Sequence, residues 1–463
     1  MNLPFIWIIL PILFAITALF VRNRNSLYYG LLLALSLILC SMAFIIASQD
    51  NEAGLPFTLY EDFSVLGRRF VITSNDLSLV GVIYALIFFW ILAAFFQQTN
   101  SYFPALSVIY AALSIASYSI EPFLYSVLII FLANTLYLPV LSSGSFQKIS
   151  GRMRFLVFQL LSVFLILLAG WILAGGEITP VDEDQLFFSS ILLGLGIATW
   201  LGTFPFHTWI PLLAEEVLFM PFGFMLTLFP ISGILMLMKF LNDFAWLREY
   251  QAFFISIQYL GAAMVLIGGI GSFFQKLTSR VFAFVFISGI GMLLCGVGFI
   301  PSASTDLVAG WMAPFILSLL SISLASQKFT GSNLTHTIED LKGKITEYPL
   351  FSLLLLSGLS SLIGLPLSSG FAPNLELLYN ARSTNQIILV MVICGQVFLI
   401  LTGIRLLLRL VLASPKKFSI PGKIGMDSIL ILFLILFNTI LGLFPKLVNE
   451  PVLATIGRIF PLL

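Results

Sequence analysis

Long runs of apolar residues, separated by short polar segments, follow one another along nearly the whole chain. A membrane helix needs about 20 predominantly apolar residues, whereas a transmembrane strand alternates apolar and polar side chains. The runs here are continuous, so they predict an all-α polytopic membrane protein. We expect fourteen transmembrane helices, at about residues 3–21, 27–48, 77–97, 103–119, 121–141, 154–175, 187–209, 218–241, 251–270, 278–299, 308–327, 349–366, 386–413 and 425–444.

Two segments rich in Pro and Gly, residues 201–233 and 362–376, interrupt the apolar pattern. Non-helical backbone at membrane depth must be buried in protein or line a water-filled cavity. Broken helices at corresponding positions of two halves of a chain indicate inverted repeats. We therefore expect two discontinuous helices in inverted repeats. Simple proline kinks are the alternative.

These repeats suggest a division of the chain into four parts. They are N-terminal helices with an outer hairpin loop (1–102), a first five-helix repeat (103–241), a second five-helix repeat (251–413) and a C-terminal helix with a tail (414–463). The hairpin is expected over residues 49–76, where aromatic and polar residues alternate around Gly and Pro. The tail over residues 446–463 is expected to be an amphipathic helix at the surface.

Composition narrows the class of protein further. Only 9% of the 463 residues are charged and 59% are hydrophobic, whereas soluble domains are about 25% charged. A soluble multi-domain enzyme is excluded because the polar surface is too small to solvate it. The net charge of +1 gives no basic footprint for nucleic acid. The expected surroundings are the lipid bilayer and other membrane proteins.

The sequence offers no cofactor or metal site. Cys40, Cys295 and Cys394 all lie inside apolar runs without metal-ligand spacing, so we interpret them as small hydrophobic residues. There is no Walker or dinucleotide-binding glycine motif and no ligand set for flavin, haem or an iron–sulfur cluster. No cofactor is expected.

The distribution of basic residues predicts the orientation, because inner loops are enriched in Lys and Arg. With fourteen spans and the N-terminus outside, both termini lie on the outer side, and we expect a bacterial plasma membrane. Most of the 22 basic residues then fall inside: Arg22, Arg24, Lys148, Arg152, Arg154, Lys276, Arg280, Lys328, Lys342, Lys344, Arg405, Arg409, Lys416, Lys417 and Lys423.

Several motifs resemble, in order along the chain, the antiporter-like membrane subunits of respiratory complex I (NADH-quinone oxidoreductase chains of the L, M and N type). The related D-type subunits of multisubunit sodium/proton antiporters belong to the same family. The motifs are NTLYLPVL (134–141), FPFHTWIP (204–211) followed by Glu215, QKLTSRVFAFVFISGIGMLLCGVG (275–298), THTIEDLKG (335–343), LIGLPLSSGF (362–371) and ILGLFPKLV (440–448). The resemblance implies fourteen spans, proton transport and partner membrane subunits.

The same resemblance implies a row of ionisable residues through the middle of the membrane, and this chain departs from it. The family's fifth-helix glutamate aligns with Asn134, its seventh-helix lysine with Trp200 and its eighth-helix lysine with Pro230. None of these side chains titrates near neutral pH. No Lys or His lies between Arg280 and Lys328 either. We expect a degenerate member with weakened or lost proton transfer.

The remaining candidates for a proton path are His207, Glu215, Glu216, Lys239 and Arg405. His207 titrates in a suitable range; the alternative is a helix-end side chain bonded to backbone. Glu215 matches the family's acidic position; the alternative is that Glu215 and Glu216 form a carboxylate pair in water. For Lys239 the alternative is an ion pair with Asp243 at the outer interface.

Arg405 and Arg409 lie four residues apart on the predicted span 386–413. An arginine at the bilayer centre costs about 2.5–3.5 kcal/mol on insertion scales. Arg405 therefore either snorkels inward with Arg409, toward Lys416 and Lys417, or lines a wet cavity. The inner-loop residues His336, Glu339, Asp340 and Lys342 are expected to form a solvated or partner-contacting face.

The sequence thus favours a non-redox, antiporter-like subunit of a proton-translocating NADH-quinone oxidoreductase-type complex. It would act mainly in packing, with proton transfer weakened or lost. A second possibility is conduction along a rerouted path through His207, Glu215 and Arg405. A third is a stand-alone secondary transporter or a component of a cation/proton antiporter.

Overall fold

A computed structural model describes residues 2–48, 60–65, 67–97, 101–142, 149–175, 183–303, 305–331, 333–412 and 425–462. Within these ranges, eleven helices are long and apolar enough to cross a membrane. Three shorter apolar helices, Phe5–Leu19, Phe103–Ser119 and Pro349–Ile363, lie where further spans are predicted. The prediction of an all-α polytopic membrane protein is confirmed, while the count of fourteen spans stays a prediction.

The chain separates into two compact units. Unit 1 comprises Met1–Ser143 and Gln159–Ile197, and unit 2 comprises Gly144–Phe158 and Ala198–Leu463. The division into two five-helix repeats stays a prediction.

The first part of the chain forms these elements: η1 (Phe5–Ile9), α1 (Leu10–Leu19), α2 (Asn25–Ser48), β1 (Asp62–Val65), β2 (Arg68–Val71), η2 (Ser74–Asp76), α3 (Leu77–Gln97), α4 (Phe103–Ser119), β3 (Ile120–Glu121), η3 (Phe123–Tyr125), α5 (Ser126–Leu141), α6 (Ser150–Gly175) and α7 (Glu183–Leu201). In unit 1, α4 is buried along almost its whole length. Two tyrosines link the elements of unit 1. The Tyr28 hydroxyl of α2 accepts a hydrogen bond from the Ala105 N–H of α4 at 3.1 Å, and the Tyr84 hydroxyl of α3 donates to the Trp7 carbonyl of η1 at 2.6 Å.

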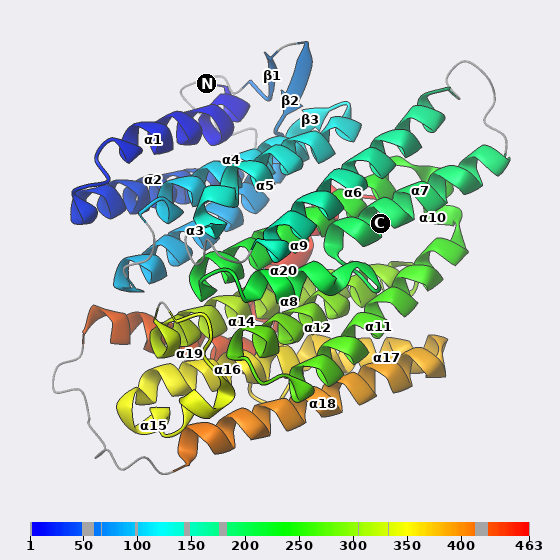
Figure 1. Cartoon of the computed structure of the whole chain (residues 1–463). Coiled ribbons are helices and arrows are strands. Elements are labelled where there is room, and N and C mark those ends of the chain that lie inside the picture. Colours follow the sequence, from blue (N-terminus) through cyan, green and yellow to red (C-terminus); the bar gives the residue numbers. More distant parts are fainter. Residues whose placement is uncertain are drawn as a thin grey trace. The chain divides into compact units, whose positions relative to one another are not determined.

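A hairpin is present where one was predicted, and its place on the outer side stays a prediction. Strands β1 and β2 pair antiparallel, with Asp62 opposite Val71, and β3 joins β2 with Glu121 opposite Arg69 (Figure 1). Residues 49–59 of the predicted hairpin segment lie outside the described residues. The span predicted over residues 121–141 begins later than expected, because Glu121 lies in β3 and α5 begins five residues later.

The second part of the chain forms these elements: η4 (Phe206–Thr208), α8 (Trp209–Ala214), α9 (Phe219–Asp243), α10 (Ala245–Glu249), α11 (Gln251–Phe274), α12 (Thr278–Gly298), α13 (Ile300–Ala303), α14 (Asp306–Thr330), η5 (Ile338–Leu341), α15 (Lys344–Glu347), α16 (Pro349–Ile363), α17 (Phe371–Thr384), α18 (Gln386–Val411), α19 (Met426–Leu443) and α20 (Lys446–Ile459).

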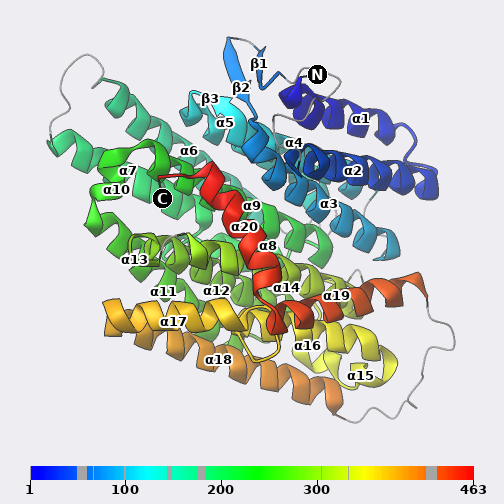
Figure 2. The ribbon, with the colours of Figure 1, turned by 180° about the vertical axis from the view of Figure 1, so that it is seen from behind.

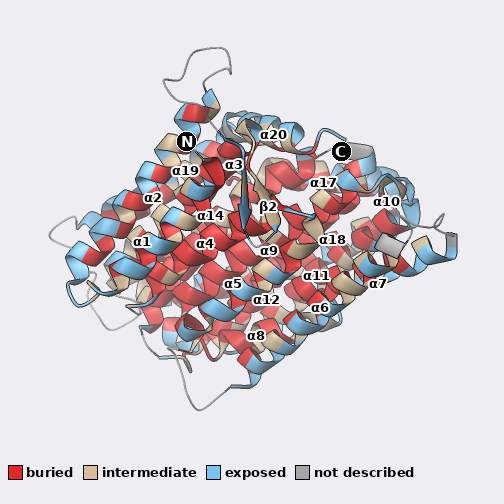
Figure 3. Cartoon of the chain, turned by 90° about the horizontal axis from the view of Figure 1, so that it is seen from above, coloured by how far each residue is buried: buried red, intermediate tan, exposed pale blue. Residues whose placement is uncertain are grey.

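The core of unit 2 is built from α9, α12 and α14, whose side chains are almost all buried (Figure 3). Helix α11 packs against both α12 and α18, and α17 runs beside α18 (Figure 1). Glycines permit the close approach of α11 and α18, because a Cβ atom at Gly269 would lie 2.2 Å from the carbonyl oxygen of Gly395. Helices α18 and α19 expose most of their apolar side chains, as expected for helices that face lipid.

Helices end inside both segments that were predicted to be discontinuous. Helix α7 ends at Leu201, and α8 begins at Trp209 after the short turn η4. Helix α16 ends at Ile363, and α17 begins at Phe371. Pro230 lies inside the continuous helix α9, so a proline in the predicted segment does not by itself end a helix. The two helix breaks lie beside glycines instead. Whether the two breaks are related by an inverted repeat stays a prediction.

The C-terminal tail forms a helix, as predicted, and its place along the membrane surface stays a prediction. In unit 2, α20 packs on α14, with Ile456 and Phe460 buried and Arg458 exposed (Figure 2). The N–H of Leu462 donates to the Asn242 side chain at 3.2 Å. An apolar face on the protein and a charged face outward are what amphipathic patterning predicts.

Candidate functional site

The break after α7 brings a glycine, a histidine and several aromatic rings together. Gly202 ends the helix with a φ of +63°, a conformation that residues with a Cβ atom rarely adopt. A Cβ at this position would lie 2.7 Å from the indole nitrogen of Trp209. Gly202 therefore allows the chain to turn and Trp209 to pack directly against the backbone.

His207 lies in η4, within this break. Its ring is half-buried beside Phe204 (ring centroids 6.0 Å apart) and meets Phe284 edge-on at 6.4 Å. Nδ1 is buried and makes no hydrogen bond among the described residues. Within the described part of the chain, His207 forms no hydrogen bond, ion pair or ring contact with another candidate residue, so its role in a proton path stays a prediction.

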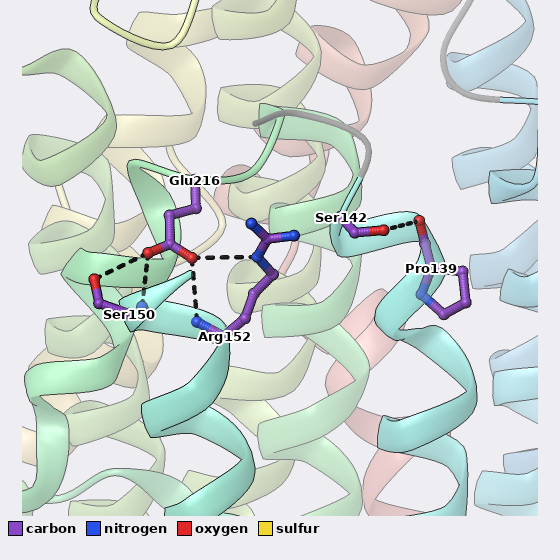
Figure 4. A network of polar contacts seen from close by, with 6 residues as sticks. Pro139, Ser142, Ser150, Arg152 and Glu216 are labelled. Carbon is purple, nitrogen blue, oxygen red and sulfur yellow. Dashed lines mark hydrogen bonds and ion pairs between the residues drawn. The ribbon is translucent and has the colours of Figure 1, made fainter. Parts of the chain in front are cut away.

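Glu216 holds the first turn of α6. Its carboxylate accepts hydrogen bonds from the backbone N–H of Gly151 at 2.7 Å and of Arg152 at 3.2 Å, and from the Ser150 hydroxyl at 3.1 Å (Figure 4). The Arg152 guanidinium completes the site with an ion pair at 3.3 Å. Glu216 thus satisfies free N–H groups at a helix N-terminus, where a negative charge is favoured.

Glu215, the neighbour of Glu216, binds a different helix. Its carboxylate accepts a charged hydrogen bond from the guanidinium of Arg280, which lies in the first turn of α12. The Glu215 side chain is 11% exposed and that of Glu216 is 1% exposed. The alternative of a carboxylate pair in water is therefore wrong, because each carboxylate is largely buried against its own arginine.

Arg405 caps the C-terminal end of α11. Its guanidinium donates to the carbonyl oxygens of Phe273 and Gln275, the second at 3.0 Å. A cation at a helix C-terminus is favoured by the helix dipole. Arg409, one turn later, pairs with Glu339 at 2.7 Å. Lys416 and Lys417, toward which Arg405 and Arg409 would snorkel in one of the two alternatives, lie outside the described residues.

The inner-loop segment around His336 is tied to the start of α12. The N–H of Thr278 donates to the His336 carbonyl at 3.0 Å, and the N–H of Ile338 donates to the Lys276 carbonyl at 3.0 Å. His336 is 9% exposed, and its Nδ1 has no hydrogen-bond partner among the described residues. The expectation of a solvated face is wrong for His336, whereas Glu339, Asp340 and Lys342 are exposed.

The ion pairs and backbone hydrogen bonds described above lie at one end of unit 2. The ion pairs and backbone bonds join the start of α6, the α8–α9 connection, the α11–α12 turn, the 335–343 loop and the end of α18. All five segments are predicted inner segments, as alternating spans require. Lys239 is half-buried near the opposite end of α9, away from this group.

The three positions that lack a titrating residue are occupied by an amide, an aromatic ring and a proline. In unit 1, buried Asn134 accepts from the Tyr110 hydroxyl at 2.9 Å and donates to the Gln159 side-chain oxygen at 3.2 Å. In unit 2, Trp200 stacks on Phe229, with ring centroids 5.6 Å and planes 8° apart. Pro230 lies inside α9, directly after Phe229.

The second break is held by neutral side chains. Asn438 of α19 accepts from the Ser369 N–H at 3.2 Å and from its hydroxyl at 2.6 Å, and it donates to the Ser357 carbonyl at 2.9 Å. The Ser361 and Ser369 hydroxyls bond each other at 2.7 Å. Polar groups at a helix break in lipid must be satisfied inside the protein, and Asn438 does this here.

Sequence reasoning missed Arg152, Gln159 and Asn438 as site residues. Arg152 was counted only as an inner charge, although its side chain is buried against Glu216. Gln159 and Asn438 are isolated polar residues inside apolar runs. Such isolation is a usable signal, because a buried polar group needs a partner.

Comparison with known proteins agrees with this architecture. The profile described as "NADH:quinone oxidoreductase/Mrp antiporter, TM" matches residues 74–399. The NADH-quinone oxidoreductase subunit N of Flavobacterium psychrophilum is 24% identical over 273 residues. That alignment covers 58% of this chain and 59% of the relative, so the chain spans about three-fifths of that relative's length.

Two solved structures share the fold. A chain of the Mrp complex from Dietzia sp. superposes with a TM-score of 0.79 at 15% identity, covering 99% of this chain and 98% of that one. A chain of respiratory complex I from Thermus thermophilus superposes with a TM-score of 0.74 at 18% identity, covering 99% and 100%. The family profile covers well over half of the chain, which therefore belongs to the NADH:quinone oxidoreductase/Mrp antiporter transmembrane family.

Proposed function

We propose that this chain is an antiporter-like membrane subunit of a proton-translocating, NADH-quinone oxidoreductase-type complex, and that it carries no protons across the membrane by itself. Other membrane subunits are its partners, a bacterial plasma membrane is its location, and both termini face outward. Family membership supports the assembly. The single observation that carries the loss of transfer is the stacking of Trp200 on Phe229, where the resemblance implies a lysine.

The chemistry of the three replaced positions supports this proposal. A proton relay at membrane depth needs groups that exchange a proton near neutral pH, which Asp, Glu, His and Lys provide when their pKa is tuned. The amide of Asn134, the indole of Trp200 and the ring of Pro230 do not titrate in that range. Hydrogen bonds from Tyr110 and to Gln159 also fix the orientation of the Asn134 amide.

The placement of charge gives further support. In the eleven long apolar helices, charged side chains lie within about two helical turns of a helix end. In unit 2, Arg152, Arg280 and Arg409 form ion pairs and Arg405 caps a helix. The rerouted path through His207, Glu215 and Arg405 has little support, because each of these residues contacts a different set of neighbours.

A role in a multisubunit cation/proton antiporter is the second candidate. It is supported by the family description, which includes Mrp antiporters, and by the shared fold with a chain of the Mrp complex. The missing titrating residues weigh equally against proton transfer by this chain in either assembly.

Purification of the tagged full chain from its native membrane tests the assembly. Co-purification with other antiporter-like subunits and with redox subunits is the expected result, and co-purification with cation-antiporter subunits alone would favour the second candidate. Recovery as a single polypeptide that moves protons after reconstitution would contradict both.

A further inference from the structure

Four large aromatic side chains meet beside the break of α7. They are Phe155 of α6, Trp200 at the end of α7, Trp209 at the start of α8 and Phe229 of α9, and each is 0% exposed. Phe155 lies 4.9 Å from Trp209 and 5.9 Å from Phe229, and Trp209 meets Phe229 edge-on at 5.8 Å (all between ring centroids). We call these four residues the aromatic cluster.

The aromatic cluster has no side chain with exposed surface. The indole N–H of Trp209 is buried and makes no hydrogen bond among the described residues. An ordered water needs two to four polar partners. Gly202 closes the break over this indole, because even a methyl group there would collide with Trp209. Close-packed rings of this kind hold few voids as large as a water molecule.

The contacts of Glu216 fix the position of Phe155. Glu216 binds the N–H groups of Gly151 and Arg152 at the start of α6, and Phe155 lies one turn further along the same helix. The helix start is pressed onto α8, since a Cβ at Gly151 would lie 2.5 Å from the backbone nitrogen of Leu213. We call Glu216 and Arg152 the latch. Because the latch fixes the start of α6, it determines how deeply the Phe155 ring enters the aromatic cluster.

We propose that the aromatic cluster is a hydrophobic seal that prevents passive ion leakage through this chain, and that Glu216 is the positioning residue that latches Phe155 into it. This inference rests on the proposed function, because a subunit that carries no protons in a coupled membrane must also not leak them. Hydrophobic constrictions exclude ions by excluding water. The function of the aromatic cluster would then be to keep ions from crossing the membrane through this chain.

Passive proton influx tests the seal. The intact complex is reconstituted into liposomes with an internal pH dye, and a potassium diffusion potential is imposed with valinomycin in the absence of substrate. We expect Trp200→Ala and Phe155→Ala to raise the influx about tenfold or more over wild type. Phe158→Ala is the matched control, because Phe158 lies on the same helix but pairs with Phe206 outside the cluster; it should leave the influx unchanged.

If the alanine variants do not assemble, Phe155→Leu replaces them in the influx assay. It removes the ring contacts and retains an apolar side chain of similar bulk, and we expect it to leak more than Phe158→Leu. Assembled variants of Trp200 and Phe155 that are as tight as wild type would overturn the seal. A wild-type chain that itself conducts would instead overturn the proposed function, so the two failures are distinguishable.

Hydrogen exchange tests the latch. Glu216→Gln is expected to speed amide exchange over residues 151–155 about tenfold and to raise the influx, since local opening is governed by the contacts that hold a segment. Glu215→Gln is the matched control, because it removes the neighbouring carboxylate, which binds Arg280 and not α6. Unchanged exchange in Glu216→Gln, or equal effects of both variants, would overturn the positioning role.

Discussion

The indole of Trp200 lies flat against the ring of Phe229, with centroids 5.6 Å apart and planes 8° from parallel. Both side chains are completely buried. Where the family resemblance implies a lysine, this chain thus has an apolar contact. Stacked rings contribute about 0.5–1.5 kcal/mol beyond their area burial, so the contact stabilises the fold at a position where the resemblance implies a proton carrier.

The substitution Trp200→Lys should destabilise the protein. An unpaired ammonium buried among rings costs several kcal/mol, and a cation–π attraction of about 2 kcal/mol offsets only part of this. We expect a loss of about 3 kcal/mol in the free energy of unfolding, measured by thermal unfolding in detergent. Trp200→Phe, which keeps an aromatic ring, should lose only about 1 kcal/mol. Wild-type stability of Trp200→Lys would show that the site accepts a charge.

The substitution Asn134→Leu should lower stability without altering proton movement. It removes the acceptor of the Tyr110 hydroxyl and the donor to Gln159, which are buried contacts. Lost buried hydrogen bonds of this kind cost about 1–3 kcal/mol. Thr135→Leu is the control, because Thr135 is exposed and its hydroxyl bonds to Phe131 of its own helix. A loss of proton pumping with normal assembly would contradict the neutral role of Asn134.

The amide of Asn438 should be required for the second break. Asn438→Leu leaves the Ser369 N–H and the Ser357 carbonyl without their partner from α19. A loss of about 2 kcal/mol is expected, together with faster amide exchange over residues 364–371. Thr439→Leu serves as the control, since Thr439 is half-buried and its hydroxyl bonds to Leu436 of the same helix. Equal exchange in the two variants would argue against this role.

The contact between the 335–343 loop and the α11–α12 turn should weaken in mild acid. Burial lowers the pKa of His336 from its ordinary value of 6.5; nearby Asp340 opposes this and Lys344 adds to it. The unfolded loop then binds a proton more readily than the folded loop, so stability rises with pH. The stabilisation of the loop contact by neutral His336 is complete above pH 6.5. It is lost as the pH falls through the lower pKa of His336 in the folded state.

Amide exchange measures this pH dependence. After correction for the intrinsic rate, protection of the Thr278 and Ile338 N–H groups should fall between pH 7.5 and about pH 5. His336→Gln should abolish the change. A pH-independent protection in the wild-type chain would contradict the assignment to His336.

Features set by local pattern could be predicted from the sequence. The apolar runs gave the helices, the Pro- and Gly-rich segments marked both breaks, and the alternation in residues 49–76 indicated the hairpin that β1 and β2 form. Each of these depends on residues close together in the chain. The tail helix α20 follows from the same kind of local pattern.

Features set by distant partners could not be predicted. Glu215 and Glu216 look like a solvated pair until Arg280 and Arg152 are brought to them from other helices. Glu121 could not be placed in a strand without β2, in which Arg69 lies opposite it. Burial of His336 likewise depends on the α11–α12 turn, more than 50 residues earlier in the chain.

The number of protons translocated per electron pair tests the central claim most directly. It is measured with the purified complex in liposomes, comparing wild type with His207→Ala, Glu215→Gln and Arg405→Gln in this chain. If the chain carries no protons, the ratio is unchanged in every assembled variant. A ratio that falls in any assembled variant, while electron transfer continues, would contradict the account.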